Sequence, residues 1–305
     1  MNKKKAICIL CNIEGEKLVL NDLPMRKCFE CGLIWRETFD IPVEHYKSKE
    51  FDISNSKIES RLRNSQGRIK ILSKYAVPNH VCDIGCGEGL FLRVLKESGY
   101  KNNIGIEPSR TETFKDSRDL EIYKGTIDDV CNIIKNKDIH IFTMFHLIEH
   151  LSDPIGTISR LRECMVPGDY LMVETPDINS YIFKASNYKH PLIYPEHLFY
   201  YNRTNLGKLL KSCGLKMVAS GKRGFDQKHM SIRNSMERLG LAPYSGTQGY
   251  LQREQSMKEE LGRKSVSEDK RGTLASVRAF IRTLLNLFVT VFGRADYQWI
   301  IVKKV

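Results

Sequence analysis

The chain has 305 residues, of which 41% are hydrophobic and 28% are charged, so it can bury a large core and has the composition of a soluble globular protein. Its net charge of +12 is spread along the sequence, which favours solvated faces over a dedicated nucleic-acid-binding surface. The first residues include lysines but no apolar run as long as that of a signal peptide, so we expect a cytoplasmic protein.

Four of the nine cysteines form two Cys-x-x-Cys pairs, Cys8 with Cys11 and Cys28 with Cys31. Two such pairs at this separation can place four thiolates around zinc, and a structural site of this kind has no open position for catalysis. We therefore predict a zinc-binding module over residues 1–50. A redox role lacks the strand–helix setting of a thioredoxin-like site. The five other cysteines are scattered through apolar segments, which is typical of a reducing compartment.

A linking helix follows this module. Ser56 can cap a helix from about Lys57 to Tyr75, with apolar residues along one face.

The stretch from Val81 to Leu90 reads as a buried strand, a glycine-rich turn and the start of a helix. Without side chains, Gly85 and Gly87 let the backbone approach a ligand closely. Asp83 is unusual for a phosphate site, because its carboxylate would repel phosphate and attract a cation or an amine. From residue 78 onward, strands and helices alternate, which favours a parallel sheet with helices on both faces.

The segment Asp83-Ile84-Gly85-Cys86-Gly87-Glu88-Gly89 resembles motif I of the class I S-adenosylmethionine (SAM) methyltransferases, whose ligand carries a sulfonium and an ammonium. The resemblance implies an α/β fold with a Rossmann-like, seven-stranded class I methyltransferase sheet, preceded by the small zinc-ribbon-like module. It also implies that the helix before the first strand helps to cover the cofactor. The implied cofactor-binding residues in the motif are Asp83, Gly85, Cys86 and Gly87.

Two acids further on complete the predicted cofactor site. Glu107 ends the second strand about 20 residues after the glycines, where a carboxylate can accept hydrogen bonds from ribose hydroxyls. By resemblance, Asp128 contacts the adenine, although it can instead be an acid of a first helical turn.

The strand over residues 139–145 runs directly into His146-Leu147-Ile148-Glu149-His150. This order matches an inverted zinc-protease motif, but Pro154 follows too soon for the long helix that such a motif needs. The segment resembles the same region of ubiquinone-pathway O-methyltransferases and their sugar-modifying relatives. That resemblance implies that Phe145 and His146 line the cofactor and that Glu149 and His150 lie near the acceptor or support the loop. A functional and a structural role for His150 both stay open.

The connection over residues 176–200 is rich in aromatic residues and is a candidate substrate-facing loop. Its Tyr194-Pro195-Glu196-His197 resembles a Tyr-x-Glu-His segment of deoxysugar C-methyltransferases, which also carry an N-terminal four-cysteine zinc module. We predict that His197 is a general base, with Glu196, Tyr194 and His150 as further catalytic candidates. The alternative is that Glu196 and His197 only anchor the loop.

The predicted methyltransferase core spans residues 51–221, with a helix over 204–213 capped by Asn202. Residues 222–272 read as a charged insertion. Residues 273–305 read as an amphipathic helix, 274–292, and the last strand, 297–302. Packing inside the protein, dimerisation and docking on the inner face of a membrane all stay open for this helix.

The sequence predicts SAM-dependent methyl transfer to an oxygen or carbon of a small polar acceptor, a sugar or a nucleotide- or lipid-linked glycan precursor. The further C-terminal domain of the sugar C-methyltransferases is not visible in the chain, which favours oxygen. The alternatives are a quinone or phenol O-methyltransferase, an RNA methyltransferase and a non-enzymatic zinc-ribbon adaptor. We expect no nucleic-acid partner, and the sequence leaves the oligomeric state open.

Overall fold

The computed structural model describes residues 6–39, 55–108, 119–180, 183, 192–223, 280, 284 and 296–305. Its main feature is a seven-stranded sheet in the order β10-β11-β8-β7-β4-β5-β6, in which β11 runs antiparallel to both neighbours. This confirms the predicted sheet. Its strands are β4 (Val81–Ile84), β5 (Ile104–Glu107), β6 (Glu121–Lys124), β7 (Ile141–Phe145), β8 (Tyr170–Pro176), β10 (Leu215–Arg223) and β11 (Tyr297–Lys304).

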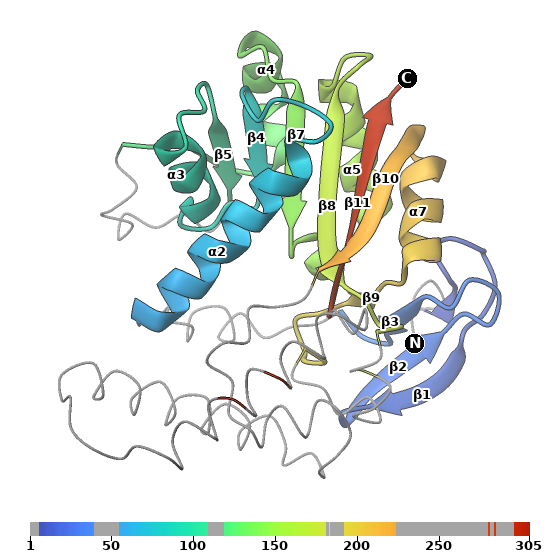
Figure 1. Cartoon of the computed structure of the whole chain (residues 1–305). Helices are drawn as coiled ribbons and strands as arrows, with labels where there is room; N and C mark the ends of the chain where they lie inside the picture. The colour runs from blue at the N-terminus through green and yellow to red at the C-terminus, as the bar shows by residue number, and fades with distance from the viewer. Residues whose placement is uncertain are drawn as a thin grey trace, which may run out of the picture.

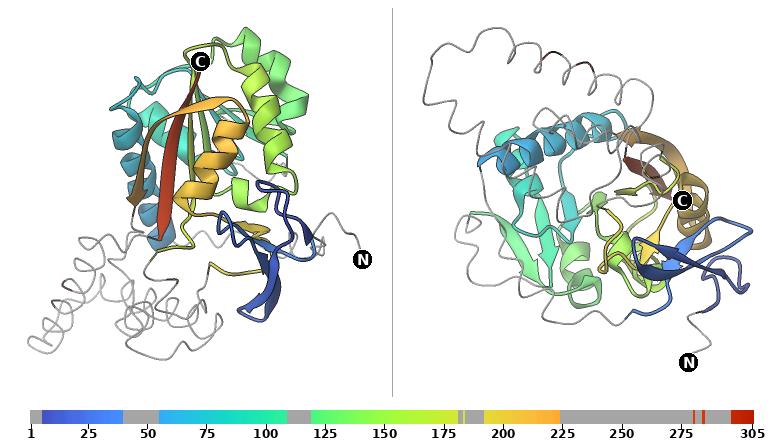
Figure 2. Two further views of the ribbon diagram at one scale, coloured as in Figure 1. Left: turned by 90° about the vertical axis from the view of Figure 1, so that its right-hand side faces the viewer. Right: turned by 90° about the horizontal axis from the view of Figure 1, so that it is seen from below.

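Helices cover both faces of this sheet (Figures 1 and 2). On one face lie α2 (Asn55–Leu72) and α3 (Leu90–Glu97); on the other lie α4 (Ile127–Asn136), α5 (Pro154–Cys164) and α7 (Arg203–Ser212). Side chains alternate along each strand, so Val81 packs with the α2–α3 cluster whereas Cys82 packs with the opposite one. The helix expected over residues 57–75 begins and ends slightly earlier, and the predicted cap of α7 is confirmed, because the Asn202 side chain accepts a hydrogen bond from the Asn205 amide.

The parallel strands β4, β5, β7 and β8 all end at the same edge of the sheet. The chain order reverses between β4 and β7, since β5 and β6 lie to one side and β8 to the other. A crevice at such a switch point is where open α/β sheets bind ligands. After β7 the chain makes only one 3-10 turn, η3 (Ile148–His150), as Pro154 predicted.

A second sheet of four strands joins the N-terminal module to the core. Its order is β1 (Glu16–Leu20), β2 (Leu23–Lys27), β3 (Ile34–Arg36) and β9 (Phe199–Tyr200). The last strand comes from the aromatic connection, and Trp35 of β3 pairs with Phe199. Trp35 also belongs to the same buried cluster as Leu206 of α7. The module and the connection are therefore built as one unit, and the domain limits given above stay a prediction.

A disulfide links Cys131 of α4 to Cys164 of α5, which the sequence analysis did not predict. The two cysteines are 33 positions apart and become neighbours only because their helices pack side by side.

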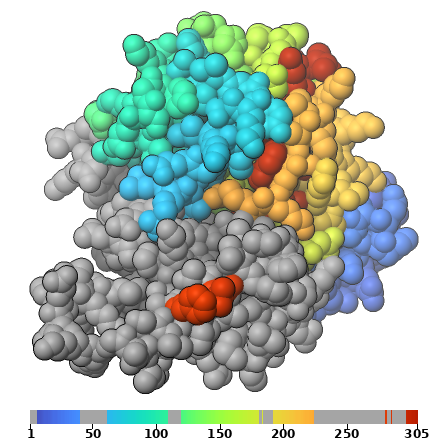
Figure 3. Space-filling model, in the orientation of Figure 1, coloured from blue at the N-terminus to red at the C-terminus, as the bar shows by residue number. Residues whose placement is uncertain are grey.

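The two late segments fall almost wholly outside the described residues. Of the predicted insertion, only Lys222 and Arg223 are described, and they end β10. Of the predicted amphipathic helix, Phe280 and Leu284 are described; both are helical and expose 63% and 47% of their surface. Figure 3 shows them as the coloured patch among grey atoms. Within the described ranges, no helix has the length and apolar character needed to cross a membrane.

Candidate active site

The glycine turn after β4 is held open for a ligand. Gly85 and Gly87 have φ values of 71° and 54°, which side-chain-bearing residues rarely adopt. A Cβ added at Gly85 would lie 2.9 Å from the Leu147 side chain, whereas one added at Gly87 would meet no protein atom within 4 Å. The amides of Gly85 and Cys86 both donate to the carbonyl of Ile106, which fixes the turn against β5. The backbone at Gly87 therefore faces open space.

Glu107 lies beside this glycine turn, at the end of β5, where its spacing from the glycines predicted it. Its carboxylate Oε2 accepts a hydrogen bond of 2.9 Å from the Gly87 amide, and the residue is 8% exposed. The carboxylate at the end of β5 thus adjoins the glycine turn and can accept hydrogen bonds from vicinal hydroxyls.

Asp83 lies beneath the turn, 4% exposed, and accepts a hydrogen bond of 2.6 Å from the Thr143 hydroxyl on β7. Burial raises its pKa to about 7, and the nearby Glu107 carboxylate acts in the same direction, against the Thr143 hydrogen bond and the charge of Arg68. A buried carboxyl that ionises near neutral pH is a group whose charge a cationic ligand can stabilise.

The remaining motif residues lie less directly in this site. The Cys86 sulfur packs over β5, because a Cβ added at Gly105 would lie 2.5 Å from it. Asp128 lies in the first turn of α4, where its carboxylate forms an ion pair of 2.8 Å with Arg160 of α5. Its predicted adenine contact stays a prediction.

Near the ends of β7 and β8, Glu174 contacts three basic side chains. This residue is fully buried, and it accepts hydrogen bonds of 2.6 Å from Nη2 of both Arg68 and Arg223. His146 Nε2 lies 3.2 Å from the same carboxylate. Burial alone would raise the pKa of Glu174, but the Arg68, His146 and Arg223 groups outweigh it and hold this pKa well below its usual range. The sequence carries no local signal for this cluster, since its members come from α2, β8, β10 and the residue that follows β7.

His146 bridges two buried acids. Its Nδ1 lies 3.4 Å from Glu149 Oε1 while its Nε2 faces Glu174. Burial favours the neutral ring, but the two carboxylates outweigh it and raise the pKa of His146. The preceding Phe145 ring carries the Arg68 guanidinium 4.1 Å from its centre, a cation–π contact. Both residues therefore lie at the switch point, and their predicted contact with the cofactor stays a prediction.

The predicted catalytic residues meet at one place. The ring of His197 lies 4.6 Å from that of His150 and 4.0 Å from that of Tyr194. The Nδ1 atoms of both imidazoles contact backbone carbonyl oxygens, His150 with Glu196 at 2.9 Å and His197 with Leu192 at 2.8 Å. With the Nδ1 atoms as donors, each Nε2 keeps its lone pair.

The carboxylate that faces His197 is Glu149, and not the adjacent Glu196. Glu149 Oε1 lies 3.9 Å from His197 Nε2, and Glu149 Oε2 accepts a hydrogen bond of 2.9 Å from the Thr175 hydroxyl. Burial would raise the pKa of Glu149, but the hydrogen bond and charge of His146 outweigh it and lower this pKa to about 2. Burial lowers the pKa of His197 to about 3. We call Glu149, His150 and His197 the histidine cluster.

The four predicted zinc ligands also meet. The sulfur atoms of Cys8, Cys11, Cys28 and Cys31 lie within 4.8 Å of one another. Each pair forms a tight turn: the amide of Asn12 bonds to the Cys8 carbonyl, and that of Gly32 bonds to the Cys28 carbonyl, both at 2.9 Å. Four cysteine sulfur atoms this close together, carried by paired turns, fit zinc. We call this group the cysteine cluster.

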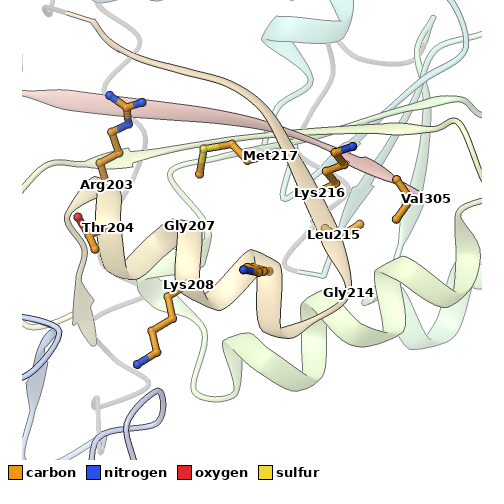
Figure 4. A pocket seen from close by; sticks show the side chains of 10 residues that line it. Arg203, Thr204, Gly207, Lys208, Gly214, Leu215, Lys216, Met217 and Val305 are labelled. Carbon is orange, nitrogen blue, oxygen red and sulfur yellow. The ribbon is translucent and has the colours of Figure 1, made fainter.

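A separate groove runs between α7 and the β10–β11 edge (Figure 4). Its lining includes the basic residues Arg203, Lys208, Lys211 and Lys216 and the apolar residues Leu215 and Met217. It is lined by neither the glycine turn nor the histidine cluster.

One family match identifies the class of protein. Residues 57–220 match the family described as "Methyltransferase domain", so the chain belongs to that family. The chain is similar to the crystal structure of a SAM-dependent methyltransferase from Archaeoglobus fulgidus, with 17% identity, a TM-score of 0.50 and coverage of 86% of this chain and 100% of that one. This likeness shows the fold.

Two further solved structures are similar at lower scores. One is a putative methyltransferase complexed with the Trm112 activator from Haloferax volcanii, with 12% identity, a TM-score of 0.46 and coverage of 80% of this chain and 93% of that one. The other is a phosphoethanolamine N-methyltransferase from Haemonchus contortus bound to SAM, with 11% identity, a TM-score of 0.47 and coverage of 84% of this chain and 58% of that one. No curated protein matches the chain. The protein is thus a member of a methyltransferase family and has a Rossmann-like fold.

Proposed function

We propose that the protein transfers the methyl group of SAM to an oxygen of a small polar acceptor, a sugar or a nucleotide- or lipid-linked glycan precursor. The observation that carries this proposal is the histidine cluster, which adjoins the cofactor edge of the sheet through His146 and Glu149. Its three hydrogen-bond-accepting groups and the Tyr194 ring suit a hydroxyl-bearing acceptor better than an apolar quinone ring.

The glycine turn and its two acids fit SAM. The open space beside Gly87 leaves room for the ligand, Glu107 is placed to accept hydrogen bonds from the ribose hydroxyls, and Asp83 supplies negative charge for the cationic end. SAM supplies the electrophilic methyl group. The task of the chain is to align the acceptor with it and to receive the acceptor's proton at an Nε2 of the cluster, with His197 as the predicted base.

The cofactor assignment is tested by a matched pair of glycine variants. Gly87 and Gly99 both have positive φ, 54° and 84°, and a Cβ at either position meets no protein atom within 4 Å. Gly87→Ala and Gly99→Ala should therefore carry similar backbone strain, about 1 kcal/mol. Only Gly87→Ala should abolish SAM binding in calorimetry, because only there would the methyl group occupy ligand space. Equal SAM affinity in the two variants would contradict the assignment.

The acceptor class is tested by incubation with labelled SAM and panels of nucleotide sugars, lipid-linked sugars, phenols and tRNA, with products analysed by mass spectrometry. Methylation at a sugar oxygen is expected. A methylated sugar carbon would keep the sugar acceptor but change the methylated atom from oxygen to carbon, and methylation of phenols or tRNA alone would overturn the sugar proposal.

We further propose that the cysteine cluster binds one structural zinc ion, with all four thiolates as ligands. The donor set and its spacing support this assignment. Its role would be to hold the N-terminal sheet, and so β9, in place.

A further inference from the structure

The groove beside α7 borders a free edge of the main sheet (Figure 4). Within the described part of the chain, β10 is the outermost strand of this sheet and pairs only with β11. Its other side therefore presents backbone N–H and C=O groups, and an extended segment of another chain can bond to such an edge as an added strand. Met217 and Val218 of β10 also expose large apolar side chains.

Basic side chains line the groove without acidic partners. Arg203 and Lys211 on α7 and Lys216 on β10 form no ion pair with any described residue, and the groove lining contains no acidic side chain. Lys208 differs, because its Nζ lies 3.2 Å from the Sγ of Cys11 in the N-terminal module. Three uncompensated positive charges beside a free strand edge favour an acidic occupant.

The spacing along the helix fits an extended segment. Arg203, Gly207 and Lys211 follow one another at intervals of four positions, so they lie along one side of α7, and Arg203 is about 12 Å from Lys211 along the helix axis. A Cβ added at Gly207 would lie 2.7 Å from Met217 Cε, so Met217 lies over the stretch between the two basic residues. In an extended chain, positions i and i+4 are about 13 Å apart and share a face. The groove thus matches the pattern acidic-x-apolar-x-acidic, with the apolar side chain against Met217.

We propose that this groove docks an acidic, extended segment of a partner protein, which adds a strand to β10. A second copy of this chain is a poorer occupant, because each copy carries a net charge of +12 and lysine on an edge strand repels a like edge. Residues 222–272 of the chain itself are also basic overall, with eleven Lys or Arg and seven Asp or Glu. Single-stranded nucleic acid is disfavoured, because no aromatic side chain lines the groove for a base to stack on. The inference goes beyond the proposed function, since it does not depend on the acceptor.

The test is fluorescence polarisation of labelled peptides titrated with the full chain. The probe peptide has a valine between two glutamates, with one threonine as spacer on each side of the valine. The control peptide has the same composition with both glutamates at one end. The probe should bind more tightly than the control peptide, and its binding should weaken as salt rises.

A pair of matched variants locates the binding. Lys211→Glu with Lys216→Glu should weaken binding of the probe roughly tenfold or more, because acidic groups then face acidic groups. Lys124→Glu with Lys135→Glu is the control, since it changes the net charge equally at exposed lysines of β6, at the opposite edge of the sheet, and of α4. The control variant should bind the probe like the wild type, and circular dichroism checks that both variants fold.

Hydrogen exchange tests the added strand itself. Amide exchange over residues 215–222 should slow when the probe binds, because the free edge of β10 becomes hydrogen-bonded. Unchanged exchange there, no binding of the probe by the wild type up to millimolar concentration, or equal effects of the two double variants overturns the proposal. A single-stranded oligonucleotide that binds more tightly than the probe and is lost in the groove variant would assign the groove to nucleic acid instead.

Discussion

The guanidinium Nη1 of Arg36 donates a hydrogen bond of 2.6 Å to the backbone carbonyl of Pro195, which lies next to Tyr194 and Glu196. The Arg36 amide also donates to the Leu198 carbonyl at 2.9 Å. A strand of the cysteine module is thus bonded to both sides of His197, although 159 positions separate Arg36 from Pro195. The position of the predicted base therefore depends on the N-terminal module.

Arg36→Met should loosen this connection. The variant keeps an unbranched apolar stem but loses the guanidinium and its charged hydrogen bonds, worth about 1.5–3 kcal/mol. We expect faster hydrogen exchange over residues 192–200 and slower methyl transfer, with SAM affinity nearly unchanged. Arg160→Met is the control, because its ion pair with Asp128 is exposed and of little energetic value. Unaltered exchange in Arg36→Met would show that β3–β9 pairing alone holds the loop.

Loss of the proposed zinc ion should also loosen the contact between the N-terminal module and the core. The carbonyl of Cys31 accepts hydrogen bonds from the side-chain amides of Asn202 and Asn205, so the cysteine cluster also contacts the start of α7. Cys28→Ser should release the single zinc ion measured by elemental analysis and increase exchange at β9. Cys213→Ser, at a buried cysteine outside the cluster, should keep the zinc. Zinc-free wild-type protein would disprove the site.

Local signals predicted most of the fold. The apolar run before Gly85, the Asn202 cap and the Pro154 stop each act within a few residues, and the structure places a turn, a helix start and a short 3-10 turn at those points. Glu107 was found by its spacing from the glycines, which follows from the length of one helix and one strand.

Long-range contacts could not be predicted in this way. Three contacts join segments that are far apart in the sequence and whose local patterns do not indicate the pairing. They are the pairing of β9 with β3, the hydrogen bonds of Arg68 and Arg223 to Glu174, and the disulfide of Cys131. Sequence adjacency alone predicts Glu196 as the partner of His197. In space the facing carboxylate is Glu149, from the other side of the site.

SAM binding should strengthen with pH. Burial raises the pKa of Asp83 to about 7, above the ordinary value of 3.8, so the ligand-free carboxyl is mostly protonated at pH 6 and mostly ionised at pH 7.5. Because the cationic ligand prefers the ionised form, SAM affinity should rise roughly five- to tenfold over this interval. The same shift means that Asp83 reduces the stability of the ligand-free fold as pH rises from about 4 to 7.

Asp83→Asn is the control for this pH dependence. The amide is similar in shape and does not ionise, so calorimetric SAM affinity should be weaker and independent of pH across the same range. A pH-dependent affinity that persists in Asp83→Asn would assign the titration to another group.

Loss of the predicted base should reduce turnover without affecting the cofactor. His197→Ala should lower the rate of methyl transfer roughly 10²–10⁴-fold, because both a proton acceptor and a cluster member disappear, while calorimetric SAM affinity stays nearly unchanged. Glu196→Gln should cause a smaller loss, since Glu196 acts on His150 through its backbone carbonyl, which the variant retains. Full activity in both variants would make this loop structural.

The exposed helical residues Phe280 and Leu284 provide the last test. They lie one helical turn apart, and Phe280 exposes most of its surface and Leu284 about half. This exposure fits an apolar face that contacts a membrane or a second chain. Phe280→Asp with Leu284→Asp should abolish co-sedimentation with anionic vesicles, which in the wild type should weaken as salt rises. Val19→Asp is the control, because this residue is 69% exposed on the N-terminal sheet, far in sequence from the helix. Wild-type protein that stays in the supernatant at low salt would exclude membrane docking. A change in molecular mass of the double variant in light scattering would then assign the face to self-association.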